Sequence, residues 1–431
     1  MSAAASAPVV CARAAGTSVC AEMRAVLAST HDELVAAYAA QHGPAGRAAL
    51  TELLAGSAAA FFLSGVDLMV IEDGTRRRFV VIEVNSAPGF AYCTPGADAW
   101  ELAYERTIDL LLGHAPPAAH GGLALLTESK VPVETEGFRR CLERRLGRAI
   151  AVLGPAELRA AERFVTERGT VLAHGGREIS GGLRYLHHLP WELLPPSAAG
   201  TFVNGTGVDL CGGRDKVAAQ LAFERFTAAF GPRGLRVNAP PGSVVRSAEE
   251  LEAVLARLGE HVVRKARHGN SGIGVDFLRG DEEDARRPPP PYPYLVQEML
   301  LPRGAAVNGA HLAAATAGGR PYAYDLRVVV GGFPGGYRPL MIYARRARRS
   351  LDELGRFDAA DLAALDDFMK VNIAVPQPGG GFAMEEERLV LPDADGFAAL
   401  GLGVDDYRVA VAESILATAA VDRFGTPYAP A

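Results

Sequence analysis

A lysine and a glycine-rich segment stand next to each other beyond the middle of the chain. Lys265 ends an apolar run, and Gly269, Ser271, Gly272 and Gly274 follow directly after it. Glycines let backbone N–H groups approach an anion closely, and a lysine adds a positive charge. The segment lacks the Walker pattern, and a strand rather than a helix is expected after it, which excludes a dinucleotide-binding loop. The pattern suits phosphate binding, but taken alone a glycine cluster of this kind is more often a flexible hairpin with a surface lysine.

Two carboxylates and an amide are spaced so that they meet on one face of a strand pair. Glu83 and Asn85 are two positions apart in an apolar strand, so they face the same side. Asp67 lies in the preceding apolar run and comes beside them if the two strands pair across the turn at Asp73-Gly74. Such oxygen ligands suit Mg²⁺, which takes a few carboxylates plus substrate phosphates. The alternative is a solvated strand face.

Further polar residues end apolar runs in the second half of the chain. Gln297 and Glu298 end one strand and offer groups for a base edge or for ribose hydroxyls. Arg327, together with Arg345 or the arginine after it, suits a clamp on a transferring phosphoryl group or a carboxylate. Asn372 follows in a further apolar segment. Each of these is weak alone, because strand ends and solvated arginine clusters are common.

The elements expected around these residues fall into three stretches. Helix over 49–64 and strands over 66–71 and 79–84 precede a linker at Pro116-Pro117. Strands that alternate with helices from about 122 to 203 predict a small, mostly parallel α/β domain. In the third stretch, Asp215 is expected to cap a helix that runs to Phe230. Ser247-x-x-Glu250 is a capping box that opens a second helix.

Composition excludes several classes of protein. The chain has 431 residues and a formal net charge of −6, which gives no electrostatic drive toward nucleic acid or anionic lipid. Five cysteines without a C-x-x-C pair exclude a disulfide scaffold and suit a reducing compartment, so we expect a cytoplasmic protein. Among them, Cys93 follows the Glu-x-Asn strand closely; we expect a buried structural thiol, and a place in the lining of the site stays open. No segment has the roughly 20 apolar residues of a membrane-spanning helix.

Together these pieces resemble the ATP-grasp superfamily over about two thirds of the chain. The resemblance implies ATP and Mg²⁺ as cofactors, with the nucleotide between two sheets. It implies phosphate contacts from Lys216, Lys265 and the loop of Gly269, Ser271, Gly272 and Gly274. The same resemblance gives Gln297 and Glu298 to the base and ribose, Asp67, Glu83 and Asn85 to the metal, and Arg327, Arg345 and Asn372 to the reacting groups.

The order of the motifs departs from most of the family. The Glu-x-Asn strand, which usually comes last, precedes the glycine-rich loop, as in the glutathionylspermidine-synthase-like branch. The expected architecture is therefore α/β, with a small Rossmann-like domain and a circularly permuted ATP-grasp module. Residues 1–115 would supply the metal-binding strands, 118–205 the small domain, and 206–431 the nucleotide-binding and catalytic subdomains.

The function that this resemblance implies is ATP-dependent carboxylate–amine ligation through an acyl phosphate, with release of ADP and phosphate. The expected partners are a small-molecule or peptide carboxylate and an amine; nucleic acid and membranes are not expected, and a homodimer stays open. Two alternatives remain, namely an ATP-dependent small-molecule kinase and an inactive nucleotide-binding scaffold.

Overall fold

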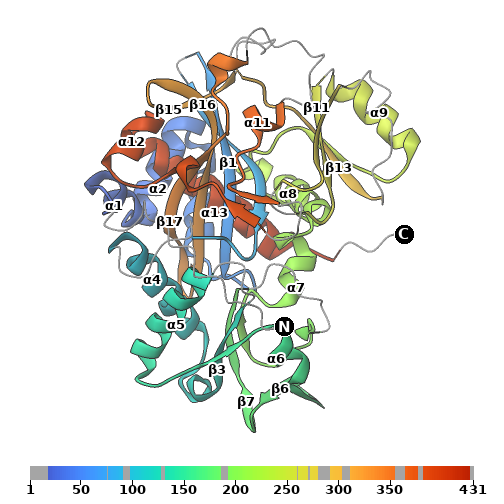
Figure 1. Cartoon of the computed structure of the whole chain (residues 1–431). Coiled ribbons are helices and arrows are strands. Elements are labelled where there is room, and N and C mark those ends of the chain that lie inside the picture. The colour runs from blue at the N-terminus through green and yellow to red at the C-terminus, as the bar shows by residue number, and fades with distance from the viewer. Residues whose placement is uncertain are drawn as a thin grey trace, which may run out of the picture.

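A seven-stranded antiparallel sheet lies at the centre of the molecule and draws its strands from both ends of the chain (Figure 1). The computed structural model describes residues 18–74, 76–90, 98–127, 132–185, 193–259, 261–269, 272–279, 292–302, 311–354, 365–376 and 382–427. The strands of the sheet are β1 (Leu63–Asp73), β2 (Arg76–Asn85), β14 (His311–Leu312), β15 (Ala314–Ala317), β16 (Arg320–Phe333), β17 (Gly336–Arg346) and β20 (Leu389–Val390).

Strand β1 lies between β2 and β16, and this position sets the neighbours of Asp67. The predicted hairpin is present, with Gly74 at a φ of 61° in its turn. Asp67 is paired with Glu83 on β2, and the register shifts at a bulge directly after Asp67. On its other side, Asp67 is paired with Arg327 on β16. One row across the sheet therefore carries these three charged residues.

The two faces of the central sheet are covered by different elements. On one face, Val66 and Leu68 are buried in the main core, where α13 (Val404–Phe424) packs against β1, β2 and β16. Because side chains alternate along a strand, Asp67 and Met69 point to the opposite face. Met69 packs there in a second core that includes Val263. The charged row of Glu83, Asp67 and Arg327 thus lies on the face turned away from the main core.

A second antiparallel sheet faces this other side of the central sheet. Its order is β10–β13–β11–β12, and β10 packs against α9. The predicted helix caps are present: Asp215 accepts hydrogen bonds from the first turn of α8, and Ser247 accepts one from the N–H of Glu250 at the start of α9. The predicted capping box is only half formed, because the carboxylate of Glu250 accepts from the N–H of Arg246. The elements are α8 (Lys216–Phe230), β10 (Gly242–Val245), α9 (Ala248–Leu258), β11 (His261–Ala266), β12 (Val275–Arg279) and β13 (Tyr294–Glu298).

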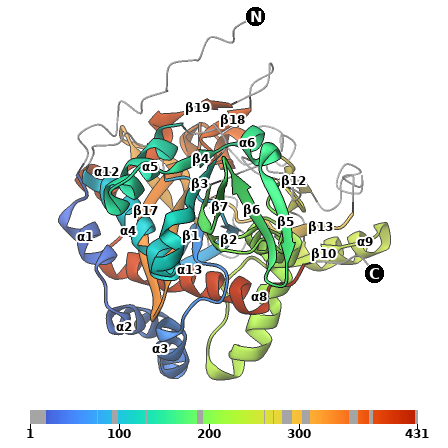
Figure 2. The same ribbon diagram turned by 90° about the horizontal axis from the view of Figure 1, so that it is seen from below.

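A third unit forms the lower end of the molecule in Figure 1. Its four-stranded sheet has the order β4–β3–β8–β9 and is parallel throughout, as the alternation of strands and helices predicts. A three-stranded antiparallel sheet, β5–β6–β7, stands beside it (Figure 2). The elements are β3 (Leu123–Thr127), α5 (Pro132–Leu146), β4 (Ala151–Leu153), α6 (Pro155–Ala160), β5 (Glu162–Thr166), β6 (Gly169–His174), β7 (Arg177–Ile179), β8 (Gly181–Tyr185) and β9 (Thr201–Val203).

The fold is mixed α/β, and one expected helix is shorter than predicted. The helix expected over 49–64 ends at Ala55, and Leu63 and Ser64 already belong to β1. In the described part of the chain no helix is long and apolar enough to cross a membrane. The remaining elements are α1 (Ala21–Leu27), α2 (His31–His42), α3 (Arg47–Ala55), α4 (Asp98–His114), α7 (Thr206–Val208), α11 (Leu365–Met369), β18 (Ala374–Pro376), β19 (Phe382–Met384) and α12 (Ala394–Leu400).

Candidate functional site

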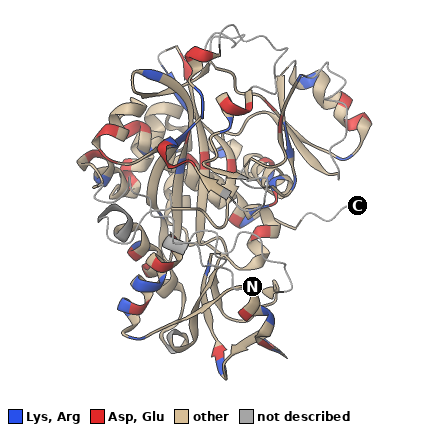
Figure 3. Cartoon of the chain, in the orientation of Figure 1, with Lys and Arg blue, Asp and Glu red and all other residues tan. Residues whose placement is uncertain are grey.

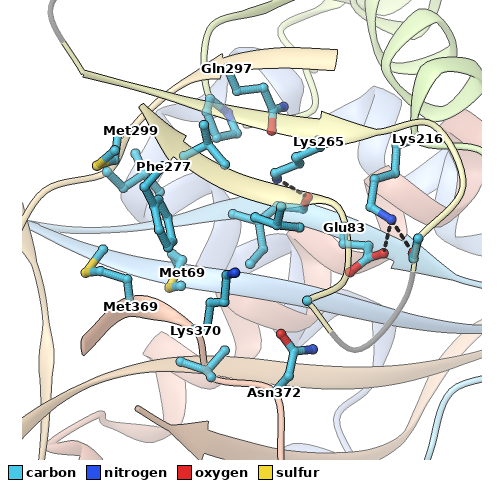
Figure 4. A pocket seen from close by; sticks show the side chains of 18 of the residues that line it. Met69, Glu83, Lys216, Lys265, Phe277, Gln297, Met299, Met369, Lys370 and Asn372 are labelled. Carbon is cyan, nitrogen blue, oxygen red and sulfur yellow. Dashed lines mark hydrogen bonds and ion pairs between the residues drawn. The ribbon is translucent and has the colours of Figure 1, made fainter. Parts of the chain in front are cut away.

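A pocket lies between the central sheet and the sheet of β10, β13, β11 and β12. Its volume is about 830 Å³, counted with the solvent at its mouth. One end is apolar, and three methionines and Phe277 gather there (Figure 4). Methionine is flexible and polarizable, so such a wall adapts to a flat ring. The apolar lining consists of Met69, Ile82, Pro240, Val263, Ile273, Val275, Phe277, Met299, Leu300, Met369 and Val371.

The other end of the pocket is charged, and its groups come from distant segments of the chain (Figure 4). Lys216 begins α8, directly after the Asp215 cap, and its Nζ lies 3.0 Å from Oε1 of Glu83. The same ammonium donates to the carbonyl oxygen of Gly269 at 2.5 Å. Lys265 on β11 donates to the carbonyl oxygen of Ile82 at 3.0 Å, 183 positions away in the sequence. The stacking of the two sheets therefore brings β2 into contact with Lys216 and Lys265, which lie far from it in the sequence.

Lys265 carries a buried amine that gives up its proton more readily than an ordinary lysine. Its side chain is 8% exposed, and burial lowers its pKa to about 8, with Lys216 adding to that effect while Glu83 and Asp67 oppose it. A buried ammonium with incomplete compensation gains from an additional negative charge. The charged end of the pocket is therefore suited to an anion.

Lysine is scarce in this protein, and its placement is selective. Only four of the 44 lysines and arginines are lysines. Three of the four, Lys216, Lys265 and Lys370, line this one pocket. Arginine serves as the general basic residue of the chain, so these positions keep lysine where a compact ammonium on a flexible stem is required. The fourth, Lys130, lies outside the described residues.

A buried ionic cluster adjoins the charged end on the same face of the central sheet. Asp67 accepts from Nε and Nη2 of Arg327 at 2.6 and 2.7 Å, and Nη2 of Arg345 lies 3.0 Å from its second oxygen. Arg345 also pairs with Asp325, its neighbour across β16 and β17. Asn85 donates weakly to Asp67 at 3.5 Å. Both oxygens of Asp67 are therefore engaged by arginines.

The protonation of this cluster follows from burial and from the two guanidinium groups. Burial alone would raise the pKa of Asp67, but Arg327 and Arg345 outweigh it and hold the pKa below its ordinary value. For Asp325 burial prevails, and its pKa is raised although Arg345 opposes the effect. Asp67 is thus the anchoring anion of the cluster.

The glycine-rich segment lies against the charged end. Gly269 and Gly272 line the pocket, as does Asn372. Gly272 has a φ of 77°, and a Cβ there would lie 3.1 Å from Oδ1 of Asn372. Gly274 has a φ of 71°, and a Cβ there would lie 2.6 Å from the Cβ of Ala266. Both positions thus need glycine, for the left-handed conformation and for space. Ser271 lies outside the described residues.

Gln297 and Glu298 both line the pocket from β13. Gln297 is 3% exposed, and its Oε1 has no hydrogen-bond partner among the described residues. Its Nε2 lies 3.4 Å from Oε1 of Gln220 on α8. A buried acceptor without a donor is costly. A ligand with an amino group at this point would satisfy it.

Most of the residues singled out in the sequence meet at this pocket. Those that line it are Glu83, Lys216, Lys265, Gly269, Gly272, Gln297, Glu298 and Asn372. Four others do not line it: Asp67 is paired with Glu83 in the sheet, Asn85 lies two positions after Glu83, and Arg327 and Arg345 contact Asp67. Sequence reasoning missed Lys370, whose Nζ pairs with Asp366 at 2.7 Å, and it missed the methionine wall. The scarcity of lysine was a signal that would have identified Lys370. Cys93 lies outside the described residues.

The donor set allows a magnesium site only with help from a ligand. Within the described ranges, no group of three or more His, Cys, Asp or Glu side chains is arranged to hold a metal ion. Glu83 is partly exposed and faces Lys216, and Asn85 follows on the same strand face. Mg²⁺ often keeps one or two protein carboxylates and takes its other ligands from phosphates and water. Glu83 and Asn85 fit such a site. Asp67 could bind the metal only after its ion pairs with Arg327 and Arg345 are broken.

Comparisons with solved structures give distant likenesses. A glutathione synthetase-like effector from Globodera pallida is 14% identical, with 79% of this chain and 85% of the effector covered at a TM-score of 0.43. A RimK domain ATP-grasp protein from Sphaerobacter thermophilus is 17% identical. The match covers 51% of this chain and 90% of that protein, at a TM-score of 0.30. The ATP-grasp ligase PsnB, solved with a precursor variant, Mg and ADP, is 14% identical. The match covers 51% of this chain and 87% of PsnB, at a TM-score of 0.27.

No protein-family model and no curated protein matches the chain. At this level of identity and superposition, a function has to be argued from the pocket itself.

Proposed function

We propose that the chain is an ATP-dependent ligase of the ATP-grasp type, which joins a carboxylate to an amine and releases ADP and phosphate. The observation that carries the proposal is the concentration of three of the four lysines at one pocket with an apolar end. A nucleoside triphosphate has the matching shape, a flat base at one end and several negative charges at the other.

The pocket offers a partner for each part of the nucleotide. The methionine wall suits the base, and the unpaired Oε1 of Gln297 suits an exocyclic amino group. Lys216 and Lys265 suit the phosphates, and the glycine-rich segment lies close enough to them to contribute backbone N–H groups. Phosphate binding would compensate the buried charge of Lys265.

The metal would be held by Glu83 and Asn85 together with phosphate oxygens. When bound, Mg²⁺ supplies charge neutralisation on the transferring phosphoryl group. The ammonium of Lys216 now stands 3.0 Å from Glu83 and supplies the positive charge that this carboxylate needs. Asp67 as a third ligand stays a prediction, because its oxygens are bound to arginines.

The reaction would proceed by attack of a carboxylate oxygen on the γ-phosphorus, which forms an acyl phosphate and releases ADP. An amine then attacks the acyl carbon, phosphate leaves, and the amine loses a proton to solvent. Arg327 and Arg345 are both held by Asp67, the neighbour of Glu83 in the sheet, and we propose that they stabilise negative charge in this step. Asn372 lies at the same end of the pocket.

The circularly permuted order is part of the proposal. Strands β1 and β2, from the beginning of the chain, present Glu83 to Lys265 from the later segment. The pairing of β1 with β16 supports reading these segments as one module. The boundaries at 1–115, 118–205 and 206–431 stay predictions.

Hydroxylamine trapping tests the reaction. Enzyme, MgATP and pools of carboxylic acids are incubated with hydroxylamine, and hydroxamate and ADP are measured. The proposal predicts both products in equal amounts from at least one pool. Release of AMP and pyrophosphate would indicate adenylation and contradict it, and ADP with a phosphorylated alcohol would favour a kinase.

A further inference from the structure

A second pocket lies between α4, β17 and the residues that join α1 to α2. Its volume is about 1300 Å³, counted with the solvent at its mouth. Among the described residues, none lines both this second pocket and the pocket of Lys216 and Lys265. Arg338, which lines the second pocket, precedes Arg345 on β17 by seven residues, or roughly 20 Å along a strand. A ligand of the second pocket would therefore bind at a separate site.

Two arginines line the second pocket from different elements. Arg106 comes from α4 and is partly buried, and Arg338 comes from β17 and is exposed. Burial lowers the pKa of Arg106, and the positive charge of Arg338 lowers it further. The two guanidinium groups are thus close enough to repel each other. An anion bound by both of them would remove that repulsion.

The contacts of the two arginines leave their positive charge uncompensated. Neither forms an ion pair with any residue that the structure describes. Arg106 donates from Nη1 to the carbonyl oxygens of Leu27 and Pro339, at long distances of 3.3 and 3.4 Å. Arg338 lies over the ring of Phe333, with its Cζ 5.5 Å from the ring centre. Carbonyl dipoles and an aromatic face offset a full charge less than a carboxylate does.

The acidic side chains around the second pocket are engaged elsewhere. Asp109 is the only acidic side chain among the described residues that line it, and Asp109 is paired with Arg145 on α5. Glu33, in the first turn of α2, is paired with Arg408. Figure 3 shows acidic and basic positions interspersed over the molecule. Two arginines that share a pocket without a carboxylate partner are a local departure from this mixture.

The lining of the second pocket indicates the class of ligand. A guanidinium group presents parallel N–H groups that match the oxygens of a carboxylate or a phosphate. Leu27, Phe333 and Leu340 add apolar surface to the same pocket. Apolar surface beside two guanidinium groups suits a small molecule that carries an oxyanion group on an apolar body.

We propose that Arg106 and Arg338 bind the carboxylate or phosphate group of a small molecule in the second pocket, with the apolar part of that molecule against Phe333. The site does not depend on the ligase function proposed above. The alternative is that Arg106 only holds the carbonyl oxygens of Leu27 and Pro339 in place. The two roles differ in what removal of the charge does to anion binding and to stability.

Isothermal titration of the full chain with benzoate and with phenyl phosphate, at constant ionic strength, tests the binding. The two probes share a ring and differ in the anionic group, so their comparison identifies the group that is preferred. Arg106→Gln and Arg338→Gln should each weaken the tighter probe by about tenfold, since each removes charged hydrogen bonds. Because Arg338 is exposed, its variant tests the proposal without a risk to the fold.

Two control variants separate this site from other basic positions. Arg177→Gln makes the same change at an exposed position on β7 and should bind the probe as the wild type does. Lys216→Met alters the first pocket and should also leave this binding intact. Absence of saturable binding of both probes at millimolar concentrations would overturn the proposal. Equal binding by the wild type and by both arginine variants of the second pocket would do the same.

Thermal melting separates ligand binding from a structural role of Arg106. Without a ligand and at low ionic strength, Arg106→Gln should melt at or above the temperature of the wild type, because the variant loses an uncompensated charge. The tighter probe should raise the melting temperature of the wild type by about 2 °C and leave that of Arg106→Gln unchanged. A lower melting temperature of Arg106→Gln together with an undiminished response to the probe would assign Arg106 a structural role and contradict the proposal.

Discussion

At the scale of single residues, the charged end of the pocket contains one carboxylate, Glu83, and two ammonium groups, Lys216 and Lys265. Lys216 neutralises Glu83, while Lys265 has a backbone carbonyl as its hydrogen-bond acceptor. The sequence indicated Lys265 and Glu83 through the set of motifs in which they stand, and Lys216 only through the family resemblance that this set carries. It did not show that Asp67 would be held by Arg327 and Arg345, because that contact needs the register of three strands.

The lowered pKa of Lys265 predicts a pH dependence of stability. The folded protein releases this proton near pH 8, whereas an unfolded lysine keeps it to about 10.5. Between these values the unfolded chain binds more protons, so the free energy of unfolding contributed by this group rises with pH, by up to about 1.4 kcal/mol per unit. Urea denaturation from pH 7 to 10 should show this rise in the wild type and not in Lys265→Met, which should also be more stable at pH 7. Parallel pH profiles would contradict the expectation.

Glu83→Gln should abolish ATP turnover, by about a hundredfold or more, and leave the fold intact. The amide is nearly isosteric but removes the charge that a site with few protein ligands needs for Mg²⁺. Its loss of the pair with Lys216 should cost only about 1 kcal/mol, since Glu83 is partly exposed. The measurement is ADP release beside a melting profile, with the exposed Glu178→Gln as control. Retained turnover with an unchanged melting temperature would remove Glu83 from the site.

At the scale of elements, β1 is the central support of the site. It pairs with β2 on one side and β16 on the other, and its register with β2 shifts directly after Asp67. The hairpin turn at Gly74 and the helix caps at Asp215 and Ser247 were predictable, because turn and cap chemistry is local. The end of α3 was not, because the apolar run after Ala55 suits a helix as well as a buried strand.

Asp67→Asn should lower the free energy of unfolding by about 3–5 kcal/mol, since it leaves Arg327 buried without the anion that it pairs with and removes one of the two carboxylates that Arg345 contacts. Chemical denaturation measures this. Asp276→Asn is the matched control, because its pair with Arg264 is half exposed and its loss should cost less than about 1 kcal/mol. Equal effects of the two substitutions would contradict the anchoring role of Asp67.

Gly274→Ala should weaken MgATP binding by about tenfold. The residue has a positive φ, and the added Cβ would meet Ala266, the neighbour of Lys265, so the turn must shift. Gly335→Ala is the matched control, because Gly335 has a φ of 90° but no atoms within 4 Å of an added Cβ. Isothermal titration should find normal affinity in the control. Equal affinities of the two variants for MgATP would show that the turn at Gly274 does not contribute to nucleotide binding.

At the scale of the whole molecule, strands from both ends of the chain form one sheet, and a second sheet closes over it (Figure 1). Motifs indicated that Glu83 and Lys265 belong to one site, but the shape of the pocket was not predictable. The apolar wall combines residues from β1, β12 and the segment after β13, such as Met69, Phe277 and Met299. In the sequence these are ordinary core residues, and only the stacking of the sheets makes them a wall.

The central claim is that this pocket holds a nucleoside triphosphate on its lysines, and the scarcity of lysine permits a direct measurement. Protein labelled with isotopes only at lysine side chains has four side-chain amine signals, which single substitutions assign. On addition of MgATP, the signals of Lys216, Lys265 and Lys370 should shift together and saturate, and the pKa of Lys265 should rise above 8. Saturating MgATP that leaves these three signals unchanged would contradict the account.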